Sequence, residues 1–206
     1  MEWNKTDAQN LAIIDSEIDD NILSPAEYEI VRRVIYTTAD FEYQSLINFS
    51  QSALQSGAAA IAARTTLVVD VPMVKAGIAD RIQNTFANPV YCSTEAPTRP
   101  QKEKSHIAWG LEALAKRYPE CIFIIGQDQT ALTALINLIT LGEIKPALVV
   151  ATPVSFVDVS VACERLRESG VPNITINGRK GGASVAVAII DALIDLAWQA
   201  YGESRE

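Results

Sequence analysis

Short apolar runs alternate with longer helical patterns along the chain after about residue 65. Five runs are only a few residues long and mostly apolar on both faces: 65–71, 88–92, 121–126, 146–151 and 173–177. Between them, apolar residues recur at the spacing of a helix over 103–117, 129–141 and 158–169. Strands that are apolar on both faces are typical of a parallel sheet covered on both sides. The pattern therefore predicts an α/β fold, a mostly parallel sheet with helices on both faces.

The first sixty residues differ, because their pattern predicts helices throughout. The segment Ser24-Pro25-Ala26-Glu27 combines an N-cap serine, a proline at the first helical position and the glutamate of a capping box. An apolar stripe then carries this helix to about Tyr36. No linker or repeat divides the chain, so we expect a single domain over 1–206, with a helical N-terminal segment at about 9–63 and an α/β core at about 65–201.

Composition places the chain among well-packed globular proteins. Hydrophobic residues make up 49% and charged residues 20% of the 206 positions, which supports one sizeable core. The formal net charge of -8 argues against non-specific binding to nucleic acid or anionic membrane, because both require a positive field. The first ten residues lack a signal-peptide pattern, and Asp191 and Asp195 interrupt the apolar stretch 183–201, which indicates a buried helix. We therefore expect a cytoplasmic protein.

Cysteine and histidine usage excludes several kinds of site. The three cysteines are odd in number and none lies in a CxxC pair, so we expect free buried thiols. The only histidine, His106, falls in the polar opening of a predicted helix, which indicates a solvated side chain. A His-rich metal site is excluded and a Ser-His-Asp hydrolase is disfavoured. The acids Asp40 and Glu42 have no spacing that requires a metal, so no metal site is predicted.

The turn Asn177 to Gly182 is the strongest candidate site, because ligands of open α/β sheets bind at the carboxyl ends of the strands. Its glycines permit close backbone approach, and the helix that follows offers free N–H groups. Arg179 and Lys180 add positive charge, so the turn suits an anion. A tight turn with two solvated cations is the alternative. The turn has neither a P-loop nor a dinucleotide-binding motif.

Three other strand ends carry loops of interest. Residues 126–130 follow a strand, and Asp128 suits the N-cap of the next helix, so simple capping competes with a functional role. Asp70 ends the first strand of the core and is either an N-cap or a site residue. The segment 152–156 begins another crossover and is a weak signal by itself.

Six segments in a fixed order carry a resemblance over about residues 11–200. They are VRRVIYTTADFEY (31–43), FSQSALQSGAAAI (49–61), DVPMVKAGI (70–78), GQDQTAL (126–132), TPVSFVDV (152–159) and VPNITINGRKGGASVAVAIIDAL (171–193). Each segment alone is weak, whereas their order and spacing are specific. The chain resembles the precorrin isomerases, also called precorrin-8X or cobalt-precorrin-8 methylmutases.

This resemblance implies an α/β homodimer that moves a methyl group from C11 to C12 of a corrinoid ring in cobalamin biosynthesis, with no organic cofactor. Any cobalt belongs to the substrate. The ring carries many acetate and propionate carboxylates, for which Arg179 and Lys180 are natural receivers. The substrate-binding residues implied are Thr37, Thr38, Asp70, Gly126, Gln127, Thr130, Pro153, Val154, Arg179, Lys180, Gly181 and Gly182.

The chain departs from the family pattern at the position of its catalytic residue. The family usually reads VIHTTGDF, and its histidine is credited as the general acid, whereas this chain has Tyr36 there and Ala39 in place of the glycine. A phenol has an ordinary pKa near 10, against about 6.5 for imidazole, so it transfers a proton less readily. We interpret Tyr36 as a hydrogen-bond donor or weak acid. Further departures are Ser155 and the triplet Val161 to Cys163.

Two other function classes compete with the isomerase. A catalytically silent relative that binds a corrinoid or other tetrapyrrole is suggested by the replaced histidine. A nucleotide- or phosphate-binding protein is suggested only by the Gly/Arg/Lys turn at 177–182. Turnover of the corrinoid discriminates the isomerase from the silent relative. Equilibrium binding of ATP or NAD would favour the nucleotide- or phosphate-binding protein.

Overall fold

One six-stranded sheet organises the computed structural model, which describes residues 5–18, 23–97, 104–157 and 159–202. The strand order is β1-β6-β5-β4-β2-β3, and β2 to β6 are parallel. The strands are β1 (Ile47–Phe49), β2 (Leu67–Val69), β3 (Val90–Cys92), β4 (Ile122–Ile125), β5 (Leu148–Ala151) and β6 (Asn173–Ile176). Each of the five predicted strands is present, shortened at its ends where the chain turns into loops.

The edge strand β1 corrects the prediction that the first sixty residues are helical throughout. It pairs antiparallel with β6, with Ile47 opposite Ile176. Ser50 extends the pairing, because its N–H donates to the Asn173 carbonyl at 2.9 Å and its hydroxyl accepts from the Asn173 N–H at 2.8 Å. A three-residue strand is too short to show a period of two, and only its long-range pairing defines it.

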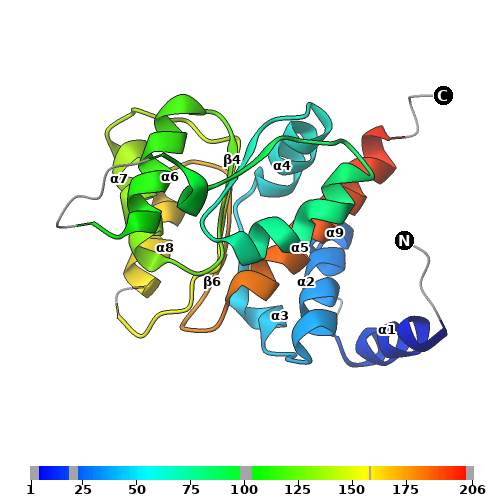
Figure 1. Ribbon diagram of the computed structural model, residues 1–206. Helices are drawn as coiled ribbons and strands as arrows, with labels where there is room; N and C mark the ends of the chain where they lie inside the picture. Colours follow the sequence, from blue (N-terminus) through cyan, green and yellow to red (C-terminus); the bar gives the residue numbers. More distant parts are fainter. Residues whose placement is uncertain (1–4, 19–22, 98–103, 158, 203–206) are drawn as a thin grey trace.

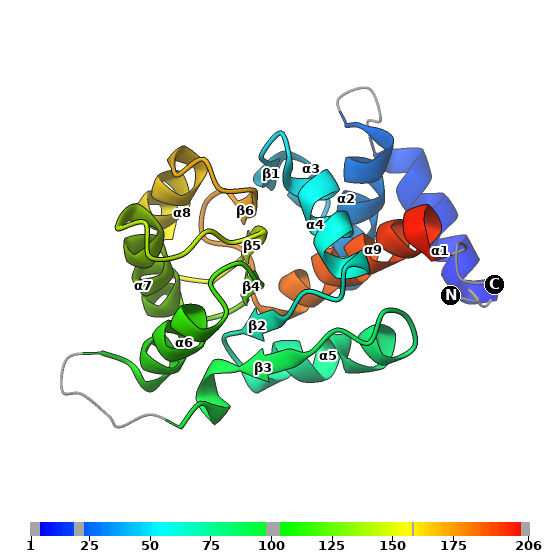
Figure 2. The ribbon, with the colours of Figure 1, turned by 90° about the horizontal axis from the view of Figure 1, so that it is seen from above.

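Helices cover both faces of the sheet, as the sequence predicts (Figures 1 and 2). Alternate strand residues explain the doubly apolar strands: Ile122 and Ile124 of β4 point into one core, and Phe123 and Ile125 into the other. One face carries α6 (His106–Arg117), α7 (Gln129–Thr140) and α8 (Val159–Glu168). The other carries α4 (Ala53–Ala62), α5 (Pro72–Gln83) and α9 (Ala183–Tyr201), with α1 (Lys5–Glu17), α2 (Pro25–Thr38) and the short α3 (Tyr43–Leu46) beyond them.

The long helix α9 is the centre of the second face. It packs against α2, α4 and α5, and ten of its nineteen residues are buried. By length and composition alone it is long and apolar enough to cross a membrane, yet 56% of its apolar window is buried inside the protein. The ten buried residues confirm the predicted burial of this stretch. Each fully buried aliphatic side chain stabilises the fold by about 1.5–3 kcal/mol relative to an exposed one.

The helix α2 begins as its capping box predicts. The Ser24 N–H donates to Glu27 Oε2 at 2.8 Å, and the Ser24 hydroxyl accepts from the Glu27 N–H at 3.4 Å. At its other end Ala39 adopts a left-handed conformation with φ 54°, and its N–H donates to the Ile35 carbonyl. This sharp exit places Tyr36 in the last turn of the helix.

An ion network joins α2, α5 and α9 on their outer side. The Asp195 carboxylate accepts from Arg33 Nη2 at 2.6 Å and from Arg81 Nη1, and Arg81 Nε also lies 3.7 Å from Asp191 Oδ1. All four side chains are at least two-thirds buried. Burial raises the pKa of Asp191 to about 6, although Arg81 and Arg33 oppose the shift.

Asp191→Asn tests the energetic cost of that buried carboxylate. Its pKa is about 6 in the folded protein and near 4 in the unfolded chain, so the folded state holds the proton between these values. Stability therefore falls as the pH rises from about 4 to about 6, by roughly 2–3 kcal/mol for this group. Urea unfolding should show the variant about 1–2 kcal/mol more stable than wild type at pH 8 and nearly equal at pH 4.5.

Asp80→Asn, on the exposed side of α5, is the matched control and should follow wild type at both pH values. Equal losses of stability by Asp191→Asn at pH 4.5 and pH 8 would show that the carboxylate is a net stabilising partner of Arg81.

Candidate functional site

Asp70 lies at the point where the strand order reverses. The chain runs from β2 outward to β3 and then returns to the other side of β2 as β4, so the loops after β2 and β4 diverge there. Such a switch point is the usual ligand crevice of an open α/β sheet. Asp70 follows β2 directly, and Gly126 follows β4. The crevice is therefore bounded by two of the predicted site residues.

The Asp70 carboxylate fills this position itself. Its oxygens accept hydrogen bonds from the N–H groups of Gly126 at 3.0 Å, Gln127 at 2.7 Å and Asp128 at 2.8 Å. The residue is fully buried. Burial raises the pKa of the Asp70 carboxyl, and the three N–H donors oppose that shift because they stabilise the ionised form. Asp70 is thus an internal anion that shapes the loop, and its direct contact with substrate stays a prediction.

The neighbouring predicted residues on this loop also have structural partners. A Cβ on Gly126 would lie 2.7 Å from Val74 Cγ2 and 3.0 Å from Ala183 Cα, so glycine lets α5 and α9 begin side by side. Thr130 Oγ1 donates to Asp128 Oδ1 at 2.5 Å and pairs with the Ser105 hydroxyl at 2.8 Å. Asp128 is the N-cap of α7. The amides of Gly126 and Gln127 therefore position the loop, while the Gln127 side chain is exposed.

The loops after β5 and β6 touch through their backbones. The Gly182 N–H donates to the Thr152 carbonyl at 2.6 Å, and Thr152 Oγ1 donates to the Gly182 carbonyl at 3.2 Å. A Cβ on Gly181 would lie 2.2 Å from that same Thr152 oxygen, and its φ of 148° favours glycine. The predicted close approach is thus between two segments of the protein. Pro153 is buried beneath it, and Val154 is 46% exposed.

The two predicted cations of the turn have different surroundings. Lys180 Nζ lies 2.5 Å from Asp40 Oδ2 and 2.9 Å from Glu42 Oε2, so it ties the turn to the loop after α2. The Lys180 hydrogen bond holds the pKa of Asp40 below its ordinary value. The Arg179 guanidinium is exposed and lies 5.4 Å from the ring centroid of Phe156. Arg179 is therefore the better placed of the two to receive a substrate carboxylate.

Tyr36 makes the contact that sequence reasoning missed. Its hydroxyl donates to Asp7 Oδ1 of α1 at 2.6 Å. That hydrogen bond is the main reason why the pKa of the phenol is raised. Thr37 and Thr38 follow it, and their hydroxyls donate to the carbonyls of the preceding helical turn. No spacing in the sequence relates two residues 29 positions apart, so Asp7 was not among the predicted site residues.

Two hollows meet at Tyr36. One, here called the Tyr36 cavity, has a volume of about 450 Å³ and lies between α1, α2, α5 and α9. Its lining is Asp7, Arg33, Tyr36, Thr37, Met73, Gly77, Ser184, Val187, Ala188 and Asp191. The other, the α1 groove, has about 400 Å³ and is lined by Asn10, Ile13, Ile14, Ile35, Tyr36, Ala39 and Phe41. The Tyr36 cavity combines an apolar wall with a few polar groups, as small-molecule sites do.

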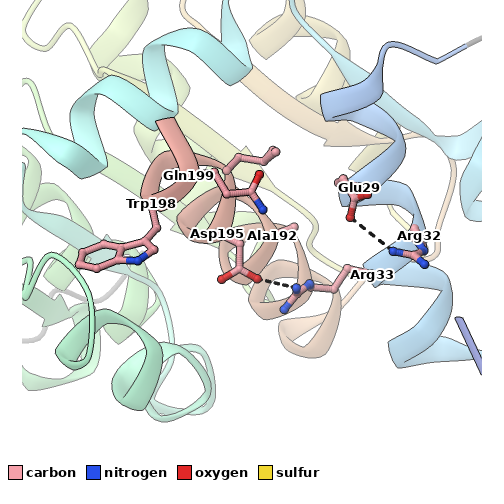
Figure 3. Close-up of a pocket in the computed structure, with 8 residues that line it drawn as sticks. Glu29, Arg32, Arg33, Ala192, Asp195, Trp198 and Gln199 are labelled. Carbon is pink, nitrogen blue, oxygen red and sulfur yellow. Dashed lines mark hydrogen bonds and ion pairs between the residues drawn. The ribbon is translucent and has the colours of Figure 1, made fainter. Parts of the chain in front are cut away.

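A third hollow, of about 290 Å³, lies between α2 and the C-terminal half of α9 (Figure 3). The Arg33–Asp195 ion pair crosses it, and Trp198 and Gln199 line it from α9. Its lining includes none of the predicted site residues. We therefore assign it to the ion network that holds the helices together.

Comparisons with known proteins identify the family over almost the whole chain. A model of the precorrin-8X methylmutase family matches residues 6–196. The chain belongs to the precorrin-8X methylmutase family. Members of this family are isomerases of cobalamin biosynthesis, and the chain is an enzyme of that class. The predicted family and the predicted α/β architecture are both confirmed.

Individual relatives give the same result. A cobalt-precorrin-8 methylmutase of Synechocystis is 36% identical over 93% of this chain and 94% of its own length. One of Methanocaldococcus jannaschii is 39% identical over 84% of this chain and 81% of its own. A solved structure of the precorrin-8X methylmutase of Thermus thermophilus superposes with a TM-score of 0.85 at 36% identity, covering 95% of this chain and 97% of the other.

The structure explains one departure from the family pattern. Ala39 stands where the precorrin-8X methylmutase pattern usually has glycine, and its φ of 54° is a conformation that glycine adopts without strain. The alanine costs about 1 kcal/mol there, and α2 ends at this left-handed position. That Tyr36 stands at the position of the family's histidine stays a prediction from the resemblance.

Asp70→Asn tests the internal anion. One carboxylate oxygen becomes an NH₂ group that faces backbone N–H donors, so at least one buried donor loses its partner. We expect the free energy of unfolding to fall by about 2–4 kcal/mol, measured by urea denaturation. Asp128→Asn is the matched control, because asparagine caps a helix as well as aspartate does. Equal small losses in both variants would contradict the assignment.

Proposed function

We propose that this protein moves the methyl group from C11 to C12 of cobalt-precorrin-8, with the ring bound at the Tyr36 cavity and the turn 179–182. The observation that carries the proposal is the position of Tyr36. Its phenol stands where the family has its catalytic histidine, and it lines both hollows at the junction of α1 and α2. The names of the curated relatives supply the substrate.

The chemistry requires positioning and charge stabilisation from the protein. The migration is intramolecular, so the enzyme holds the conjugated ring in a reactive shape and stabilises charge that develops in it. The apolar wall of Met73, Val187 and Ala188 suits a ring face, and Tyr36 and Ser184 bring hydroxyls to the same cavity. We propose that no organic cofactor takes part and that cobalt arrives within the substrate.

In this proposal, the turn 179–182 binds the acetate and propionate carboxylates of the corrinoid. Arg179 is exposed beside Phe156, which is 78% exposed, and Val154 of the same loop as Phe156 is 46% exposed. A guanidinium next to exposed apolar side chains matches a ring with a charged perimeter. Lys180 is held by Asp40 and Glu42, so it contributes mainly by fixing the turn.

The remaining expectations concern assembly and location. We propose a homodimer, as the family resemblance implies, and a cytoplasmic location, as the N-terminal pattern and the free cysteines indicate. Analytical ultracentrifugation at micromolar concentration tests the dimer, because a monomer at all concentrations would remove it.

Tyr36→Phe removes only the hydroxyl that faces the cavity. We expect the single-turnover rate to fall about 100-fold, with substrate binding within twofold of wild type, because the group acts on charge developing in the ring. The measurement follows the absorption change of cobalt-precorrin-8 on mixing with excess protein and no added cofactor.

Tyr28→Phe is the matched control for this substitution. Tyr28 also donates to an α1 aspartate, Asp15, at 2.7 Å, but lies two helical turns from Tyr36. Equal rates for Tyr36→Phe and wild type would show that the Tyr36 hydroxyl has no catalytic role and that the residue only lines the site. Tight binding without turnover, even in a Tyr36→His variant, would favour a silent corrinoid-binding relative.

Arg179→Ala tests the carboxylate contact. Loss of the guanidinium should weaken binding of the corrinoid about 10-fold at low salt and less in 0.5 M NaCl, because salt screens an exposed ion pair. Equilibrium absorption titrations at both salt concentrations measure it. Arg165→Ala on α8 serves as the control for net charge. An identical affinity of Arg179→Ala and wild type at low salt would remove Arg179 from the site.

A further inference from the structure

The Tyr36 hydroxyl has one proton, and the structure shows where it goes. The phenol donates to Asp7 Oδ1 at 2.6 Å. A hydroxyl donates one hydrogen bond and accepts up to two, so in this state Tyr36 presents only lone pairs to the Tyr36 cavity. It therefore cannot donate to a bound ring until Asp7 no longer receives its proton.

We propose that Asp7 and Tyr36 act as a two-residue proton relay to the corrinoid ring, in which Asp7 works through Tyr36. This inference rests on the proposed function and deepens it. Asp7 takes a proton from solvent, after which its carboxyl group donates to the phenol oxygen and the phenol donates into the cavity.

The relay balances in both directions. As the ring develops basic character, the Tyr36 O–H bond breaks and its proton moves to a basic ring atom, while the Asp7 proton moves to the phenol oxygen. After the methyl group has migrated, the ring returns its proton to Tyr36, and Tyr36 returns one to Asp7. No proton is consumed and no co-reactant is required.

A second pair between the same helices shows what a purely structural contact looks like. Tyr28 donates to Asp15 at 2.7 Å, eight residues along from the first pair on each helix, about 12 Å away. Asp15 is also bound by Arg32, with Nη2 to Oδ2 at 2.6 Å, so its carboxylate already has a cationic partner. The Asp15–Tyr28 pair fastens α1 to α2, whereas Asp7 and Tyr36 both line the Tyr36 cavity.

The need for a partner follows from the chemistry of phenol. A phenol beside a carboxylate is a weaker acid than a free phenol, because ionisation would place two negative charges together. Protonation of Asp7 removes that penalty. The other charged side chains that line the cavity are Arg33 of α2 and Asp191 of α9, and α5 contributes Met73 and Gly77.

Asp7→Asn is the central experiment, because the amide keeps an acceptor oxygen for the phenol but holds no transferable proton. We expect the single-turnover rate for cobalt-precorrin-8 to fall about 10- to 100-fold while the affinity stays within twofold. The wild-type rate should rise as the pH falls, and this rise should be lost in Asp7→Asn. Asp7→Glu should recover part of the rate. Asp15→Asn, the matched control, should retain the rate and its pH profile.

Asp191→Asn belongs beside these variants, because the Asp191 carboxylate lines the same cavity and burial raises its pKa to about 6. The rise of the single-turnover rate as the pH falls should remain in Asp191→Asn. Loss of that rise in Asp191→Asn with retention in Asp7→Asn would overturn the relay.

A second readout needs no substrate. In protein labelled with [ζ-¹³C]tyrosine, the Tyr36 signal, assigned by its loss in Tyr36→Phe, should titrate at lower pH in Asp7→Asn than in wild type. An unchanged phenol titration would show that the hydrogen bond is not formed in solution and would overturn the proposal. A shifted titration with an unchanged single-turnover rate would also overturn it, by making Asp7 structural. Failure of the proposed function is distinct: no variant turns over, while the phenol titration still shifts.

Discussion

The burial of α9 is the interaction on which the rest of the structure depends. The helix fills the space between the sheet and three other helices, and its ten buried residues belong to the larger of the two cores. Its N-terminus must then lie at the carboxyl edge of the sheet, where Gly181 and Gly182 bring the preceding turn against Thr152. Its side that faces α2 and α5 supplies part of the wall of the Tyr36 cavity and the acids of the ion network. The burial of α9 therefore positions both the wall of the Tyr36 cavity and the acids of the ion network.

The protein's own carboxylates then determine which polar groups remain for a ligand. Asp70 takes three amides at the switch point, and Asp40 with Glu42 takes Lys180. Side-chain carboxylates of the protein therefore already bind several of the cationic and N–H groups at the carboxyl edge of the sheet. These groups are not free to bind the proposed substrate, which is also an anion. The groups that remain for a ligand are the exposed Arg179 beside Phe156 and, in the Tyr36 cavity, the Asp7–Tyr36 pair.

Local patterns predicted most of the fold and only part of the site. The strands could be predicted because their residues are apolar on both faces, and the start of α2 because its capping box spans four residues. The strand β1 could not, because its identity depends on pairing with β6. The roles of Asp70 and Asp7 were equally hidden, since their partners lie 56 and 29 residues away in the sequence. The motifs at Tyr36 and Arg179 indicated a candidate site through family resemblance, whereas the contacts of these residues required the structure.

The central claim is that the ring of cobalt-precorrin-8 rearranges on this protein by migration of one methyl group. The most direct measurement is ¹³C NMR of substrate labelled at the C11 methyl carbon, incubated with the purified chain and no cofactor. We expect the labelled signal to leave the C11 environment and appear at the C12 position, with no label released to solution. A signal that stays at C11 on bound substrate would contradict it.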